Sequence, residues 1–171
     1  MTPTPFWEQV AAWLAGEGAA TIAAAIIGAL VVVIGYATQQ DKARRERRSQ
    51  VYSEALRAVE DYMEAPFLIR RRDDSSTTRL HITNHLSDVQ SRIAYFQAEL
   101  AIYGSSRVAS GYLDVVQSAR KEAGPAMTAA WRMRPTRRGR DVPIHRRYSR
   151  AGTDATLKQL IKLMRADVRR S

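Results

Sequence analysis

Two histidines and an aspartate at helical spacing are the side chains of this sequence that come nearest to a chemical site. His81 and His85 stand four residues apart and Asp88 follows three residues later, so a helix would place all three on one face. Such a face can present two imidazoles and a carboxylate to a metal ion. However, the sequence has no HExxH motif and no Glu-x-x-His pair, and the third histidine, His145, lies in another segment. We therefore expect these residues to line the solvent edge of a helix and predict no metal site.

Carboxylates and nucleophiles give no stronger indication of catalysis. Glu60, Asp61 and Glu64 lie close together and Asp73 precedes Asp74, but acid–base chemistry needs two carboxylates whose surroundings separate their pKa values. Nothing in these segments indicates such surroundings. The chain has no cysteine, no glycine-rich phosphate loop and no serine elbow. These features predict a protein that is not an enzyme and that has no cofactor.

The charge of the chain points to anionic partners. Its 171 residues have the length of one domain. Lysine and arginine number 27 against 17 aspartates and glutamates, which gives a net charge of +10, and every one of these cations lies after residue 40. A strongly basic chain suits nucleic acid, acidic lipid or an acidic protein surface.

An uncharged apolar run near the N-terminus predicts a transmembrane helix over residues 18–38. The run from Gly18 to Ala37 contains no charged residue, and about 20 such residues span the hydrocarbon core of a bilayer. Residues 1–17 are then a short extracytoplasmic segment with Trp7 and Trp13 at the membrane interface. A cleaved signal peptide ending at Ala37 is a weaker alternative, because no basic segment precedes the run.

The flanking charges predict the orientation of this helix. Five cations follow the run closely and are expected at the cytoplasmic interface: Lys42, Arg44, Arg45, Arg47 and Arg48. Positive flanks stay on the cytoplasmic side, so we predict a single-pass protein of the inner membrane with its N-terminus outside. Small residues within the run could let two helices meet in the membrane and form a homo-oligomer: Ala20, Ala24, Gly28 and Gly35.

Helical periodicity predicts that residues 39–171 form a cytoplasmic all-α domain. The first helix carries apolar residues on one face (Val51, Tyr52, Ala55, Val59, Tyr62 and Met63). Pro66 should end or kink it, and Arg70, Arg71 and Arg72 suit its C-terminal dipole. The second helix begins near Thr77 or Thr78, ends at Gly104 and has a heptad-spaced seam: Ile82, Leu86, Val89, Ile93, Phe96, Leu100 and Tyr103.

Two further helices complete an antiparallel bundle of about four. One begins near Ser106, and Gly124 and Pro125 should kink or divide it. The last begins near Thr153, with Thr153 or Asp154 as its cap. The fold class is therefore all-α, with one N-terminal transmembrane helix, a cytoplasmic helical bundle and one long basic loop.

The basic loop, residues 132–150, is the segment that departs from a plain bundle. Two prolines and a glycine exclude a regular helix there. A single aspartate accompanies its arginines: Arg132, Arg134, Arg137, Arg138, Arg140, Arg146, Arg147 and Arg150. These side chains could contact anionic lipid of the inner leaflet, phosphates of nucleic acid, or acidic groups of the bundle or of a protein partner.

These patterns predict a membrane-anchored adaptor whose basic domain engages a protein partner or the anionic inner leaflet. The alternative is a membrane-tethered nucleic-acid-binding protein, for example a phage or prophage exclusion factor. In its layout and its Arg- and Ala-rich composition, the chain resembles small single-pass proteins of actinobacteria and their phages.

Overall fold

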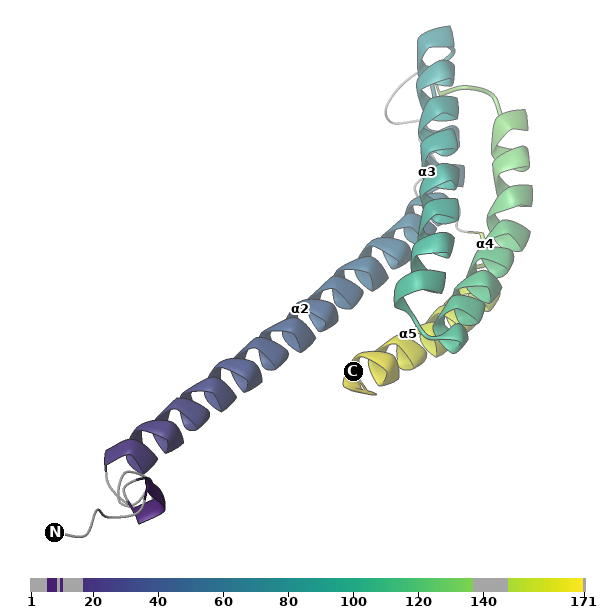
Figure 1. The fold of residues 1–171 in the computed structure, drawn as a ribbon. Coiled ribbons are helices and arrows are strands. Elements are labelled where there is room, and N and C mark those ends of the chain that lie inside the picture. The colour runs from purple at the N-terminus through teal and green to yellow at the C-terminus, as the bar shows by residue number, and fades with distance from the viewer. Residues whose placement is uncertain (1–5, 9, 11–16, 137–147, 171) are drawn as a thin grey trace, which may run out of the picture. The chain divides into compact units, whose positions relative to one another are not determined.

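Long helices make up the described part of the chain (Figure 1). A computed structural model describes all residues except 1–5, 9, 11–16, 137–147 and 171. The helices are α2 (Glu17–Arg70), α3 (Ser76–Tyr103), α4 (Ser106–Arg132) and α5 (Ala151–Arg170). No strand occurs among the described residues. The predicted all-α class with about four long helices is confirmed.

The predicted transmembrane helix is wrong. Within the described residues, no helix combines the length and the apolar character that crossing a bilayer requires. Residues 18–38 are instead the first part of a 54-residue helix. This helix continues without a break into an exposed, mostly charged stretch that includes Asp41, Lys42 and Arg44. The predicted location, a single-pass protein of the inner membrane, depended on that helix and is wrong as well.

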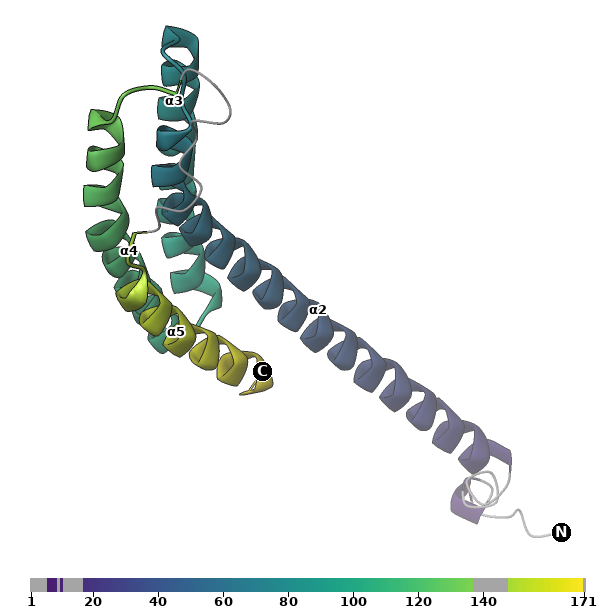
Figure 2. The same cartoon turned by 180° about the vertical axis from the view of Figure 1, so that it is seen from behind.

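The chain divides into two compact units, residues 1–44 and 45–171. The second unit is a helical bundle that contains the C-terminal part of α2 together with α3, α4 and α5. Helices α3 and α4 run in opposite directions on either side of a short turn, and α5 packs along the N-terminal part of α4 (Figures 1 and 2). The bundle therefore has the predicted antiparallel connections between neighbouring helices.

The core of the bundle lies on the apolar faces that the periodicity identifies. All six predicted core residues of α2 are buried, from Val51 to Met63. They pack with buried residues of α3, α4 and α5, which include Leu100, Tyr112 and Leu160. At the far end of α2 a smaller cluster joins Ile69, Ile82 and Ala130 from three helices. Burial of these side chains is the main favourable term in the stability of the bundle.

Neither proline ends its helix. Pro66 lies inside α2, which continues to Arg70, and Pro125 lies inside α4, which continues to Arg132. A proline removes one backbone hydrogen bond, but Pro66 is fully buried in the core and buried alanines flank Pro125. Packing of these helical turns against neighbouring helices outweighs the lost backbone hydrogen bond. Sequence periodicity alone did not indicate that the helices would continue past the prolines.

Two buried tyrosines differ in how their hydroxyl groups are satisfied. The Tyr112 side chain is fully buried, and its hydroxyl has no hydrogen-bond partner among the described residues. Tyr52 is also buried, but its hydroxyl donates a hydrogen bond to the Asp167 carboxylate. A buried polar group without a partner costs about 1–3 kcal/mol, so the two hydroxyls should contribute to stability with opposite signs.

Tyr112→Phe is expected to raise the free energy of unfolding by up to about 1 kcal/mol, because it removes the unpaired hydroxyl and keeps the ring. The matched variant Tyr52→Phe should lower it by about 1–2 kcal/mol, because Asp167 loses its donor. Urea unfolding monitored by circular dichroism measures both. A Tyr112→Phe variant less stable than the wild type would contradict the assignment.

Candidate functional site

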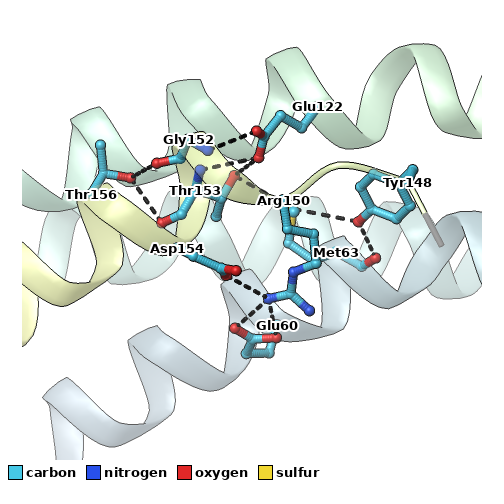
Figure 3. Close-up of polar contacts among 9 residues, drawn as sticks. All are labelled: Glu60, Met63, Glu122, Tyr148, Arg150, Gly152, Thr153, Asp154 and Thr156. Carbon is cyan, nitrogen blue, oxygen red and sulfur yellow. Dashed lines mark hydrogen bonds and ion pairs between the residues drawn. The ribbon is translucent and has the colours of Figure 1, made fainter.

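The structure divides the predicted arginines of the basic loop into separate groups. Arg132 and Arg134 are exposed at the end of α4. Arg150 donates from Nη2 to both carboxylate oxygens of Glu60, at 2.8 and 2.7 Å, and lies 3.7 Å from Asp154 (Figure 3). The other five predicted arginines lie outside the described residues: Arg137, Arg138, Arg140, Arg146 and Arg147. Arg150 therefore joins the start of α5 to α2 through Glu60.

The described ends of the basic loop are bound to α2 and to the two residues that follow it. The Thr136 amide donates to the Arg72 carbonyl at 2.9 Å, and its hydroxyl contacts the Arg71 and Arg72 carbonyls. At the other end the Tyr148 hydroxyl donates to the Met63 carbonyl (Figure 3). Burial raises the pKa of Tyr148 to about 12, so this hydroxyl keeps its proton and its donor role at neutral pH.

The N-terminus of α5 is capped by a side chain from α4. The Glu122 carboxylate accepts hydrogen bonds from the amides of Gly152 (2.9 Å) and Thr153 (3.0 Å), and from the Thr153 hydroxyl (2.6 Å) (Figure 3). Burial acts to raise the pKa of Glu122, but these hydrogen bonds and the charge of Arg150 outweigh it and lower the pKa overall. The predicted cap, Thr153 or Asp154, is thus replaced by a residue remote in sequence.

Glu122→Gln is expected to lower the free energy of unfolding by about 1–2 kcal/mol at pH 7, because it replaces a charged cap at a helix N-terminus. The ordinary pKa of the carboxyl is 4.5 and the folded value is lower. Its stabilisation is therefore complete above pH 4.5 and is lost as the pH falls through the folded pKa. Urea unfolding at pH 7 and in acid measures the difference.

The control for this experiment is Glu64→Gln, which breaks an exposed ion pair with Arg71 at 3.7 Å. It should cost less than about 0.5 kcal/mol. A difference between wild type and Glu122→Gln that stays constant into strong acid would contradict the charged cap.

The residues predicted at a membrane interface have other surroundings. Arg47 lies 3.8 Å from Glu99 and over the ring of Tyr103, and Arg48 lies 3.8 Å from Asp167. These two arginines therefore link α2 to α3 and to α5 within the bundle. The predicted interface residues Trp7, Lys42, Arg44 and Arg45 are exposed.

Other predicted residues of the N-terminal unit give no further site. A Cβ atom added at Gly28 or at Gly35 would contact no side chain or neighbouring element among the described residues. Trp13 and the side chains of Ala20 and Ala24 lie outside the described residues.

An apolar groove runs between α2 and α5 in the second unit; we name it the α2–α5 groove. Its volume is about 400 Å³, and its apolar lining comes from Tyr52, Leu56, Ile161, Met164 and Val168. Two arginines of α5, Arg165 and Arg169, also line it. The groove is open to solvent along its length and is large enough to hold side chains of a partner.

A row of cations runs along α5 beside this groove. Lys158, Lys162, Arg165 and Arg169 are all exposed and are spaced by four, three and four residues, so they share one face of the helix. The groove residues Ile161, Met164 and Val168 lie one position before three of them. Among the described residues, no carboxylate forms an ion pair with any member of this basic row. Helix α5 thus presents an apolar stripe and a positive stripe side by side.

The histidine cluster does not form a metal centre in the part of the chain that the structure describes. His81 and Asp88 are exposed and His85 is half-buried on α3. No group of three or more metal-binding side chains gathers there or elsewhere among the described residues.

Comparison with protein-family models, curated proteins and solved structures finds no match to this chain. The geometry of the chain's own surfaces therefore indicates what it could bind. The sequence analysis did not predict this groove, which three apolar residues of α5 line: Ile161, Met164 and Val168. The heptad spacing of the adjacent cations was the signal that could have shown it.

Proposed function

We propose that this protein is a non-enzymatic binding module that docks an acidic amphipathic helix of a protein partner in the α2–α5 groove. The observation that supports this proposal is the pairing of an apolar groove with the basic row of α5. Helix-in-groove recognition uses apolar anchors on one face of the bound helix. Ile161 and Val168 of α5 and Leu56 of α2 supply the surface for such anchors.

Charge complementarity selects the partner. The four cations of the basic row have the spacing of one helical face, so glutamates or aspartates on a helix lying alongside would meet them at matching positions. Like-charged helices would be repelled, which gives specificity. A single groove of this size is smaller than a standard protein interface, and we expect an affinity in the range of about 1–100 μM.

The binding test uses the full-length chain and a fluorescent helical peptide of about 18 residues with leucines on one face and glutamates beside them. The double variant Arg165→Glu with Arg169→Glu should weaken binding at least about tenfold. Each substitution removes an attractive pair with a peptide carboxylate and introduces a repulsive one. Ile161→Ser should also weaken binding, because Ile161 belongs to the groove and not to the main core cluster. Fluorescence anisotropy measures both.

The matched control is Arg120→Glu with Lys121→Glu, which makes the same change in net charge on exposed residues of α4. It should change the affinity less than about twofold. Equal weakening by the control pair would mean that the peptide responds to net charge alone, and the proposed site would be wrong. Concentration-dependent self-association that excludes the peptide would assign the groove to a second copy of the chain.

The nucleic-acid alternative gives a different result with the same variants. Binding of duplex DNA to the basic row would have a steep dependence on salt concentration. DNA binding would be weakened by the Arg165→Glu and Arg169→Glu substitutions. It would not be weakened by Ile161→Ser, because an apolar side chain offers no hydrogen-bond donor or charge to a phosphate. That combination of results would replace the protein partner with nucleic acid.

A further inference from the structure

A buried arginine ties the ends of two helices together at the far end of the bundle. The Arg72 side chain is 6% exposed. Its Nη1 donates to the carbonyls of Ile69 (3.0 Å) and Ala130 (2.8 Å), and its Nη2 donates to those of Trp131 (2.9 Å) and Met133. These carbonyls lie at the C-termini of α2 and α4, where backbone acceptors lack helical partners. The guanidinium is therefore held in one position by the backbone.

A second arginine is held beside Arg72 by a shared tryptophan. The Cζ atoms of Arg72 and Arg79 lie 5.0 and 5.4 Å from the centre of the Trp131 ring. Burial lowers the pKa of Arg72, the charge of Arg79 lowers it further, and the charge of Asp74 acts in the opposite direction without reversing the shift. Two like charges are thus packed around one indole, and a bound anion would reduce their repulsion.

A cavity of about 460 Å³ opens at this cluster. Two more arginines, Arg132 and Arg134, contribute to its wall, together with Ser76 at the start of α3. Asp73 and Asp74 are the carboxylates of the wall, so its charges sum to four positive and two negative. Among the described residues none of these four arginines forms an ion pair with a carboxylate. The positive charge of the cavity is therefore only partly compensated.

We propose that this arginine cavity binds a phosphate group carrying two or more negative charges, either a phosphate monoester or a short polyphosphate. Guanidinium groups bind phosphate oxygens in bidentate geometry, and three of the four arginines are exposed and able to turn toward a ligand. A doubly charged anion is favoured over a singly charged one because the four arginines outnumber Asp73 and Asp74, so the net attraction grows with the negative charge of the ligand.

The aromatic ring restricts the ligand further. Two guanidinium groups already lie over Trp131, so the ring is not available to stack a base in the manner of single-strand-binding proteins. The cavity volume suits a small ligand or one modified side chain rather than a duplex. Recognition then depends on the phosphate and not on an attached base.

The experiment measures binding of two probes to the full-length chain by isothermal titration calorimetry at low ionic strength: sodium tripolyphosphate and a short peptide with one phosphoserine. Arg79→Gln with Arg134→Gln should weaken binding at least about tenfold, because it removes two of the exposed guanidinium groups. Arg72 is left unchanged because its loss would disturb the helix ends. The matched control is Arg107→Gln with Arg120→Gln, exposed arginines of α4 away from the cavity.

Binding of either probe that falls in the cavity variant and not in the control supports the site, and the probe that binds identifies the source of the phosphate. Equal loss in both variants overturns the proposal, and so does the absence of binding by both probes. A peptide with glutamate in place of phosphoserine that binds equally well also overturns it. The Arg165 and Arg169 reversals should leave phosphate binding unchanged, which separates this site from the α2–α5 groove.

Discussion

The pairing of helix ends with side chains from other helices is the constraint on which this bundle depends. A helix leaves four carbonyls unpaired at its C-terminus and four amides at its N-terminus. Arg72 satisfies carbonyls of α2 and α4 together, and Glu122 satisfies amides of α5. The bonds from Arg72 to Ala130 and Trp131, and those from Glu122 to the start of α5, join segments far apart in sequence. Burial of the core residues holds the helices together. The contacts of Arg72 and Glu122 determine where the ends of α2, α4 and α5 lie relative to their neighbours.

The same contacts position the two surfaces proposed for binding. Because Glu122 holds the start of α5 against α4, the apolar stripe of α5 lies next to α2 and leaves the α2–α5 groove open. Because Arg72 is held by backbone carbonyls, its guanidinium and that of Arg79 meet over the Trp131 ring. In this bundle, both proposed binding surfaces therefore lie beside a polar contact that holds a helix end.

Apolar periodicity in the sequence predicted which faces of the helices are buried. The seam of α3 was predicted residue by residue: Ile82, Val89, Ile93 and Leu100 are buried, Leu86 and Phe96 are half-buried, and Tyr103 at the end of the helix is exposed. The start of α3 was predicted near Thr77 or Thr78, whereas the helix begins at Ser76 and Ser75 accepts the hydrogen bonds of its first turn. Contacts such as Glu122 with Thr153 have no periodic signature, because they join residues that only the folded chain brings together.

The prediction of a transmembrane helix over residues 18–38 rested on the length and the absence of charge of one local run, and no helix of the described residues has the length and apolar character that crossing a bilayer requires. Pro66 and Pro125 were each expected either to end or to kink a helix, and both helices continue past the proline. Local sequence alone did not decide between an end and a kink. Boundaries depend on what the next segment packs against, and a single sequence does not contain that information.

The net charge of the chain does not show which of its cations have carboxylate partners. Some arginines are compensated inside the bundle, as Arg150 is by Glu60 and Arg92 by Asp61. Others gather without ion pairs among the described residues, in the basic row of α5 and around the arginine cavity. Compensated arginines already have a carboxylate partner, so they are poorer candidates for recognition. The basic loop stands out by its composition. Uncompensated charge next to a groove or a cavity is the better physical criterion for a binding surface, because only there can a bound anion gain more electrostatic energy than it loses in hydration energy.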